Sequence, residues 1–179
     1  RLVSWRGRGR FRLRRWRHPA PRGAPRCAWS PGVHDDHADV VDATGGVGGI
    51  DERVGGALER AESLARELDV AIAVENHQDA TSADLVWLCE RVGSSHVGVN
   101  LDAGNPLAVG ECPIEFASRI APYLKNVHLK DYLMVPTSAG YRLVRCALGD
   151  GVVDWRALLD MFRSNAPKAT LNIELGAMH

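Results

Sequence analysis

The architecture of this chain is inferred from one short segment, Asn126-Val127-His128-Leu129-Lys130-Asp131. It is an apolar, strand-like run that ends in a histidine able to bind a metal or to move a proton. Three further segments repeat this design, at residues 70–77, 96–105 and 169–176. A helix-like pattern precedes each one. The four units together predict half of a β/α barrel whose strand ends converge on one site.

Alternation along these segments separates an apolar face from a polar one. Successive side chains of a strand point to opposite sides of the sheet. Branched residues such as Val97 and Val99 occupy one side, whereas the other side carries Gly98, Asn100 and Asp102. A buried parallel strand with only a structural role would be apolar on both sides. We therefore expect the polar side to line the inside of a barrel and to face a ligand.

Helical patterns fill the gaps between the strand-like segments. Apolar residues recur at steps of three and four over residues 52–68, which indicates an amphipathic helix. The connection over residues 132–153 is expected to be a long loop. The predicted order is βαβαβαβ with one helix in front, because parallel strands need crossover connections. Residues suited to helix ends are Thr81 or Ser82, Gly93, Pro113 and Asp154.

Composition divides the chain into two parts. The 179 residues are 45% hydrophobic and 25% charged with no net charge, which is ordinary for a soluble globular protein. Residues 1–34 nevertheless contain ten arginines and no acidic residue, and the rest of the chain balances this charge of +10. We expect an Arg/Gly/Pro-rich segment over residues 1–50, disordered or non-native, and one domain over residues 51–179.

Three interpretations of residues 1–50 stay open. Arginines interleaved with Trp5, Trp16 and Trp29 could bind nucleic acid through phosphates and stacking. A basic, acid-free start is also typical of an organellar presequence. Disordered or non-native sequence, such as the product of a shifted reading frame, is favoured because the arginines follow no helical face. The His/Asp cluster over residues 34–39 is expected to be a solvated loop.

Cysteine usage and hydropathy favour a cytoplasmic protein. The four cysteines are widely spaced and form no CxxC pair, which favours free thiols over a disulfide framework. No apolar run approaches the roughly 18–20 residues that span a bilayer, and the N-terminus lacks the apolar core of a secretory signal. Contact with a membrane is not expected. The cysteines are Cys27, Cys89, Cys112 and Cys146.

Four strand ends carry side chains that could share one cation. Glu75, Asp102, His128 and Glu174 form a mixed oxygen and nitrogen set. Such a set suits Mn²⁺, Mg²⁺, Co²⁺ or Zn²⁺ and, without thiolates, argues against a closed structural zinc site. Each residue alone is more often an ordinary hydrogen-bonded polar group. Their recurrence at the same position of successive units makes a shared metal site the stronger interpretation.

Four motifs carry a resemblance to a known family: Val74-Glu75-Asn76-His77, Leu101-Asp102-Ala103-Gly104-Asn105, Val127-His128-Leu129-Lys130-Asp131 and Ile173-Glu174. They are similar to the C-terminal half of the xylose isomerase-like TIM barrels, the sugar phosphate isomerase/epimerase superfamily. The resemblance covers roughly residues 52–179. It implies a partial (β/α)8 barrel of about four βα units, in which the four strand-end residues correspond to the family's metal ligands.

The resemblance also implies an activity. In the ketose epimerase branch the two ligand glutamates act as acid and base, so Glu75 and Glu174 would take and return a proton on opposite faces of an enediolate. The expected function is a divalent-metal-dependent isomerase or epimerase of a sugar, sugar phosphate or related polyol. For the other residues expected near the substrate, support of the ligands is the alternative role. These residues are His77, Asn105, Lys130, Asp131 and Arg145.

Two departures from the family leave alternatives open. The position three residues after the strand-six aspartate, usually histidine, is Asn105 here, and only four of the eight barrel strands can be identified. A half barrel exposes strand edges and apolar surface, so a non-catalytic truncated fragment and pairing with a second copy are alternatives. An inosose dehydratase-like lyase is another. Nucleic-acid processing in the manner of endonuclease IV is disfavoured, because that enzyme's richer ligand cluster is missing.

Overall fold

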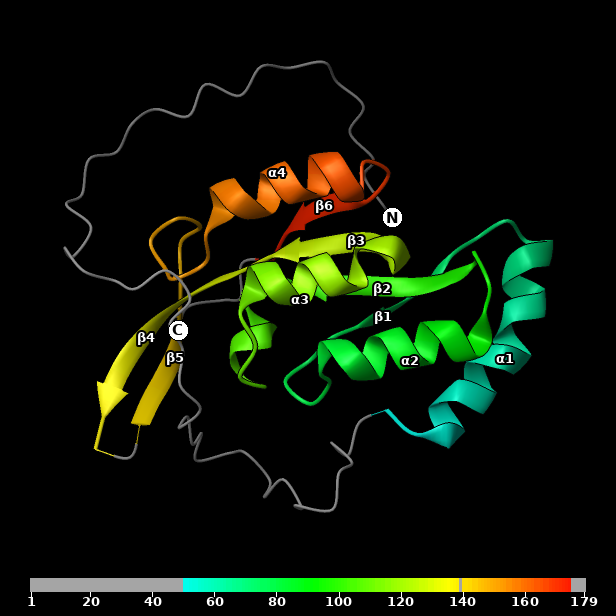
Figure 1. Cartoon of the computed structure of the whole chain (residues 1–179), viewed down its shortest axis with the longest axis horizontal. Helices are drawn as coiled ribbons and strands as arrows, with labels where there is room; N and C mark the ends of the chain where they lie inside the picture. The colour runs from blue at the N-terminus through cyan, green and yellow to red at the C-terminus, as the bar shows by residue number, and fades with distance from the viewer. Residues whose placement is uncertain (1–49, 139, 175–179) are drawn as a thin grey trace.

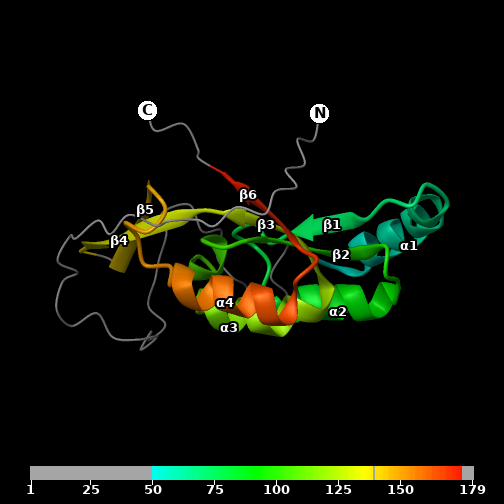
Figure 2. The same cartoon turned by 90° about the horizontal axis from the view of Figure 1, so that it is seen from above.

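A four-stranded parallel sheet forms the centre of the fold in a computed structural model that describes residues 50–138 and 140–174. Figure 2 shows α2 (Ser82–Val92), α3 (Pro113–Ile120) and α4 (Trp155–Asn165) together on one side of this sheet, while α1 (Glu52–Glu67) packs beside α2 (Figure 1). The strands, in spatial order, are β1 (Ile72–Glu75), β2 (Val97–Asp102), β3 (Leu124–Leu129) and β6 (Thr170–Ile173).

The arrangement is a partial β/α barrel, as the sequence predicts. Each adjacent pair of strands is parallel, and α2, α3 and α4 each lie between consecutive strands of the sheet in the chain. Strand order follows chain order, which is the arrangement of successive units in a TIM barrel. All strands therefore end at the same edge of the sheet.

Helix ends form where the sequence contains capping residues. The Thr81 hydroxyl accepts a hydrogen bond from the Asp84 backbone N–H, and the Asp84 carboxylate accepts one from the Thr81 backbone, which makes a capping box at the start of α2. Gly93 ends this helix in the left-handed conformation, with φ of 62°. Asp51 and Asp154 cap α1 and α4 through their carboxylates.

In β2 and β3 the two faces of the sheet differ as the alternation predicts, whereas Leu171 and Ile173 of β6, expected on the apolar face, are exposed. On the helix-covered face, Val99, Leu101 and Val127 are fully buried in a core that also contains residues of α2, α3 and α4. On the opposite face, the amide of Asn126 donates to Asn100 Oδ1 over 2.9 Å, and neighbouring side chains of β6 donate to Asn126. Buried polar groups need such partners, so this face is built for a polar interior.

The connection after β3 was expected to be a loop, and that expectation is wrong. It contains an antiparallel hairpin of β4 (Asp131–Thr137) and β5 (Gly140–Cys146), which projects away from the sheet in Figure 1. Pro136 in β4 weakens the strand pattern, yet a two-stranded ribbon tolerates proline because each strand is an edge. The strands of the sheet also differ slightly from their expected bounds: β1 begins at Ile72 and β3 at Leu124.

Cysteine chemistry only partly follows the expectation. Cys89 and Cys146 are free thiols, whereas Cys112 is disulfide-bonded, so the expectation of a free thiol is wrong there. Cys27 and the other features expected over residues 1–49 lie outside the described residues, as does Leu175. Within the described ranges, no helix is both long and apolar enough to cross a membrane.

Candidate metal centre

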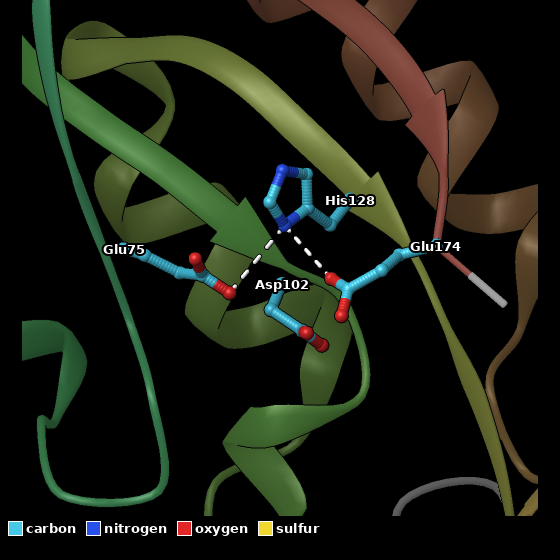
Figure 3. Close-up of side chains that lie close together, drawn as sticks. All are labelled: Glu75, Asp102, His128 and Glu174. Carbon is cyan, nitrogen blue, oxygen red and sulfur yellow. Dashed lines mark ion pairs between the residues drawn. The ribbon is translucent and has the colours of Figure 1, made fainter. Parts of the chain in front are cut away.

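The four residues expected to bind a metal converge at the carboxyl ends of the parallel strands (Figure 3). One ligand atom from each of Glu75, Asp102, His128 and Glu174 lies within 4.8 Å of every other. Glu75 and Asp102 are the last residues of β1 and β2, His128 is the penultimate residue of β3, and Glu174 directly follows β6. Asp102 and His128 are register partners. Strand register therefore creates the cluster from residues that are distant in sequence.

The imidazole of His128 lies between two carboxylates. Its Nδ1 atom is 2.9 Å from Glu174 Oε2 and 3.4 Å from Glu75 Oε1. Figure 3 shows the two glutamates facing one another from opposite sides, with Asp102 opposite the ring. The arrangement gathers three carboxylates around one imidazole. The excess of negative charge among these four side chains favours binding of a cation.

Two carboxylate oxygens at this centre are buried beside nitrogen atoms of neighbouring side chains. Asp102 Oδ2 and Glu174 Oε2 are shielded from solvent, and they contact the Lys130 ammonium and His128 Nδ1, respectively. The other oxygen of Asp102 accepts from the backbone N–H groups of Gly104 and Asn105, over 3.0 and 3.2 Å. Three carboxylates gathered in one partly buried cluster repel one another unless positive charge compensates them. The residues present therefore fit a divalent cation with oxygen and nitrogen ligands.

Lys130 supplies the positive charge inside the cluster. Its side chain is only 5% exposed, and its ammonium contacts Asp102 Oδ2 and, over 3.1 Å, Glu174 Oε1. Burial lowers the pKa of Lys130, but the hydrogen bond and charge of Asp102 outweigh that effect, so the pKa is raised. Burial likewise raises the pKa of Glu174, yet its hydrogen bond and attraction to Lys130 lower it overall. Both groups are therefore charged near neutral pH.

The remaining residues expected near the substrate lie in different settings. His77 is exposed in the segment after β1. Asn105 is buried, and its side chain contacts the Asn76 carbonyl and the Tyr132 hydroxyl. Arg145 is exposed on β5, and its charge is among those that lower the pKa of Glu174. Contact of these residues with a substrate stays a prediction.

Asp131 organises the chain segment that leads into α4. The residue is 1% exposed, and its two carboxylate oxygens accept five hydrogen bonds of 2.9 to 3.2 Å. The donors are the backbone N–H groups of Tyr132, Gly149, Gly151 and Val153 and the indole N–H of Trp155. This role of Asp131 was not expected from the sequence. The feature that could have indicated it is the position of an acidic residue directly after a buried strand.

Sequence reasoning also missed the amides that support the side chains of the cluster. The Asn100 amide lies 3.2 Å from His128 Nε2 and is itself fixed by Asn126. Asn76 is fully buried and bonds to the backbone of Asp102. For Asn100 and Asn126, the signal was their position two residues before Asp102 and His128 on the same strand face.

A family model described as xylose isomerase-like TIM barrel matches residues 23–177. The match begins within the Arg-rich segment and includes all the described elements. Among curated proteins, 3-oxo-isoapionate decarboxylase of Pectobacterium atrosepticum is 27% identical over 101 residues, which cover 55% of this chain and 37% of that protein. The chain thus spans little more than a third of this relative.

Solved structures show the same fold. A xylose isomerase-like TIM barrel protein from Mycobacterium smegmatis, in complex with magnesium, has a TM-score of 0.62 and 22% identity, covering 71% of this chain and 46% of that one. The 3-keto-D-glucoside 4-epimerase YcjR of Escherichia coli has a TM-score of 0.51 and 17% identity, covering 70% of this chain and 47% of that one. The chain covers a little less than half of each of these two proteins.

Proposed function

We propose that this chain, which belongs to the xylose isomerase-like TIM barrel family, binds one divalent metal ion at the cluster and converts a small carbohydrate by moving a proton next to a carbonyl group. The observation that carries the proposal is the approach of four ligand atoms to within 4.8 Å of one another. The proposed ligands are Glu75, Asp102, His128 and Glu174. The proposed substrate is a sugar, sugar phosphate or related polyol, handled in the cytoplasm.

The chemistry requires positive charge and a pair of carboxylates. A proton next to a carbonyl is too weakly acidic for a carboxylate alone, and a bound divalent ion supplies the charge that stabilises the resulting enediolate. Glu75 and Glu174 come from the two outer strands of the sheet and face one another. One carboxylate takes the proton from one side of the substrate, and the other returns a proton on the opposite side.

Lys130 and His128 hold one of these carboxylates in place. Lys130 contacts Glu174 Oε1, and His128 Nδ1 contacts Glu174 Oε2. The lowered pKa of Glu174, which results from Lys130 outweighing burial, keeps this carboxylate ionised and able to accept a proton. Glu75, which is partly exposed, completes the acid/base pair.

A lyase is the second candidate, and the decarboxylase relative favours it. Loss of carbon dioxide from a 3-oxo acid, or of water from a hydroxyketone, also passes through an enolate or enediolate that a divalent ion stabilises. The same four ligands would serve. The two candidates differ in outcome: an epimerase exchanges the proton with solvent and retains every carbon and oxygen, whereas a lyase releases a small molecule.

Calorimetric titration with Mn²⁺ tests the proposal. We expect saturable binding of one ion by the chain and at least about ten-fold weaker binding by Glu174→Gln. Glu115→Gln is the matched control, because Glu115 is exposed on α3 and should leave the affinity unchanged. A chain that does not bind Mn²⁺, or a Glu174→Gln variant that binds equally well, would overturn the proposal and favour a non-catalytic fragment.

A further inference from the structure

Asn76 joins two of the ligand-bearing strands at the point where they end. It follows the ligand Glu75 directly in the chain and is fully buried. Its Oδ1 atom accepts a hydrogen bond from the backbone N–H of Asp102 over 2.6 Å, and its Nδ2 donates to the Asp102 carbonyl over 3.1 Å. A single side chain thus bonds to both backbone polar groups of the neighbouring ligand.

The side-chain amide acts as an additional peptide group. The ladder between β1 and β2 pairs Glu75 with Asn100, and the Asn76 N–H donates to the Asn100 carbonyl over 3.4 Å. Beyond this point the Asn76 side chain supplies the acceptor and the donor that a further residue of β1 would have supplied. The ladder is thereby extended until it includes the backbone of Asp102.

A second amide fixes the carboxylate of the same ligand. Asn105 donates through its backbone N–H to Asp102 Oδ1 and through its side chain to the Asn76 carbonyl, over 3.2 and 3.0 Å. The Tyr132 hydroxyl contacts Asn105 Oδ1 over 3.5 Å. All four residues are at most 5% exposed, so these hydrogen bonds are protected from exchange with water.

We infer that Asn76 is a positioning residue that sets the spacing between the ligands Glu75 and Asp102, and that the affinity of the centre for a divalent cation depends on it. This inference rests on the proposed function. The geometry requires an amide of this length. Alanine leaves a buried N–H and a buried C=O unpaired, whereas aspartate cannot donate and adds a fourth negative charge beside the cluster.

The test compares Asn76→Ala and Asn76→Asp with a buried polar control. Ser82→Ala is the control, because Ser82 is fully buried and hydrogen-bonded to Glu111, which is not one of the ligands. Mn²⁺ titration is carried out at a temperature at which circular dichroism shows every variant folded. We expect the dissociation constant to rise about 10- to 100-fold in both Asn76 variants and by less than about two-fold in Ser82→Ala.

A measurement without metal separates this inference from the proposed function. Amide hydrogen exchange at Asp102, followed by NMR, should be slow in the wild type and in Ser82→Ala and at least about ten-fold faster in Asn76→Ala. If the wild type fails to bind Mn²⁺, the proposed function fails, and the exchange rate alone decides whether Asn76 fixes Asp102. Unchanged protection of Asp102, or an unchanged Mn²⁺ affinity where the wild type binds, overturns the inference.

Discussion

Replacing Lys130 by methionine should show how much the positive charge of Lys130 contributes to the stability of the folded chain. Lys130 is 5% exposed and contacts Asp102, whose side chain is fully buried, and Glu174. Methionine has a similar apolar stem and lacks the ammonium, so the substitution removes charge while largely preserving volume. Glu75 and Glu174 would then keep their contacts with His128 Nδ1, whereas Asp102 would lose its cationic partner.

The magnitude follows from which oxygens lose their partner. Asp102 Oδ1 keeps two backbone donors, but Asp102 Oδ2, which is shielded from solvent, loses its contact with the Lys130 ammonium. Breaking a buried ion pair from one side costs about 3–5 kcal/mol. Since the melting temperature falls roughly 2–4 °C per kcal/mol in a chain of this length, we expect a decrease on the order of 10 °C.

Urea unfolding with and without Mn²⁺ is the assay. A ligand present at 100 times its dissociation constant stabilises the folded state by about 2.7 kcal/mol. At one fixed Mn²⁺ concentration the increment should be larger in Lys130→Met, because a divalent ion that replaces the missing charge binds this variant more tightly. Lys168→Met, at an exposed position, is the control. A loss below about 1 kcal/mol without metal, or equal losses in the two variants, would refute the reasoning, since exposed charges contribute about that much.

Two further predictions concern the regions around the site. A Cβ atom at Gly151 would overlap Asp131 Oδ1, so Gly151→Ala should lower the free energy of unfolding by about 1–3 kcal/mol. Gly56 lies in α1, where an added Cβ atom would make only an ordinary van der Waals contact, so Gly56→Ala should raise the free energy of unfolding by about 0.5–1 kcal/mol. Equal effects of the two substitutions in urea unfolding would contradict this. Burial raises the pKa of the Cys89 thiol from 9.0 to about 11. As the pH rises above 9, the Cys89 thiol therefore ionises in the unfolded state before it does in the folded state, and the free energy of unfolding should fall. Between pH 8 and 10, Cys89→Ala should lose less stability than the wild type, and an identical pH dependence of the two proteins would show that Cys89 does not contribute.

The meeting of polar side chains at the strand ends could be predicted, because strand geometry determines which side chains share a face and where the strands end. Side chains alternate along a strand, and parallel strands end at a common edge. The spacing of Glu75, Asp102 and His128 therefore predicted both the order of the sheet and the convergence of these residues. The same rule predicted the buried apolar face that includes Val99 and Val127.

The supporting hydrogen bonds could not be predicted, because they depend on details that alternation does not contain. Asn76 lies at a position where the chain has left the strand, and its partner is the backbone of Asp102. Asp131 binds backbone N–H groups whose positions follow from the β4–β5 hairpin, and that hairpin was not expected. Backbone donors are present at nearly every residue, so sequence alone does not indicate which of them a carboxylate will accept.

The position of Glu174 in the cluster depends on the pairing of β6, which is an edge strand of the sheet. All four of its residues are exposed, and within the described residues it pairs only with β3. Glu174 follows it, while Glu75 ends the opposite border strand β1. An ion bound by both glutamates would link the two edge strands. Local unfolding of β6 would therefore lower the affinity for the ion even when all four cluster side chains are unchanged. Affinity for the ion would then report how firmly the last strand is docked.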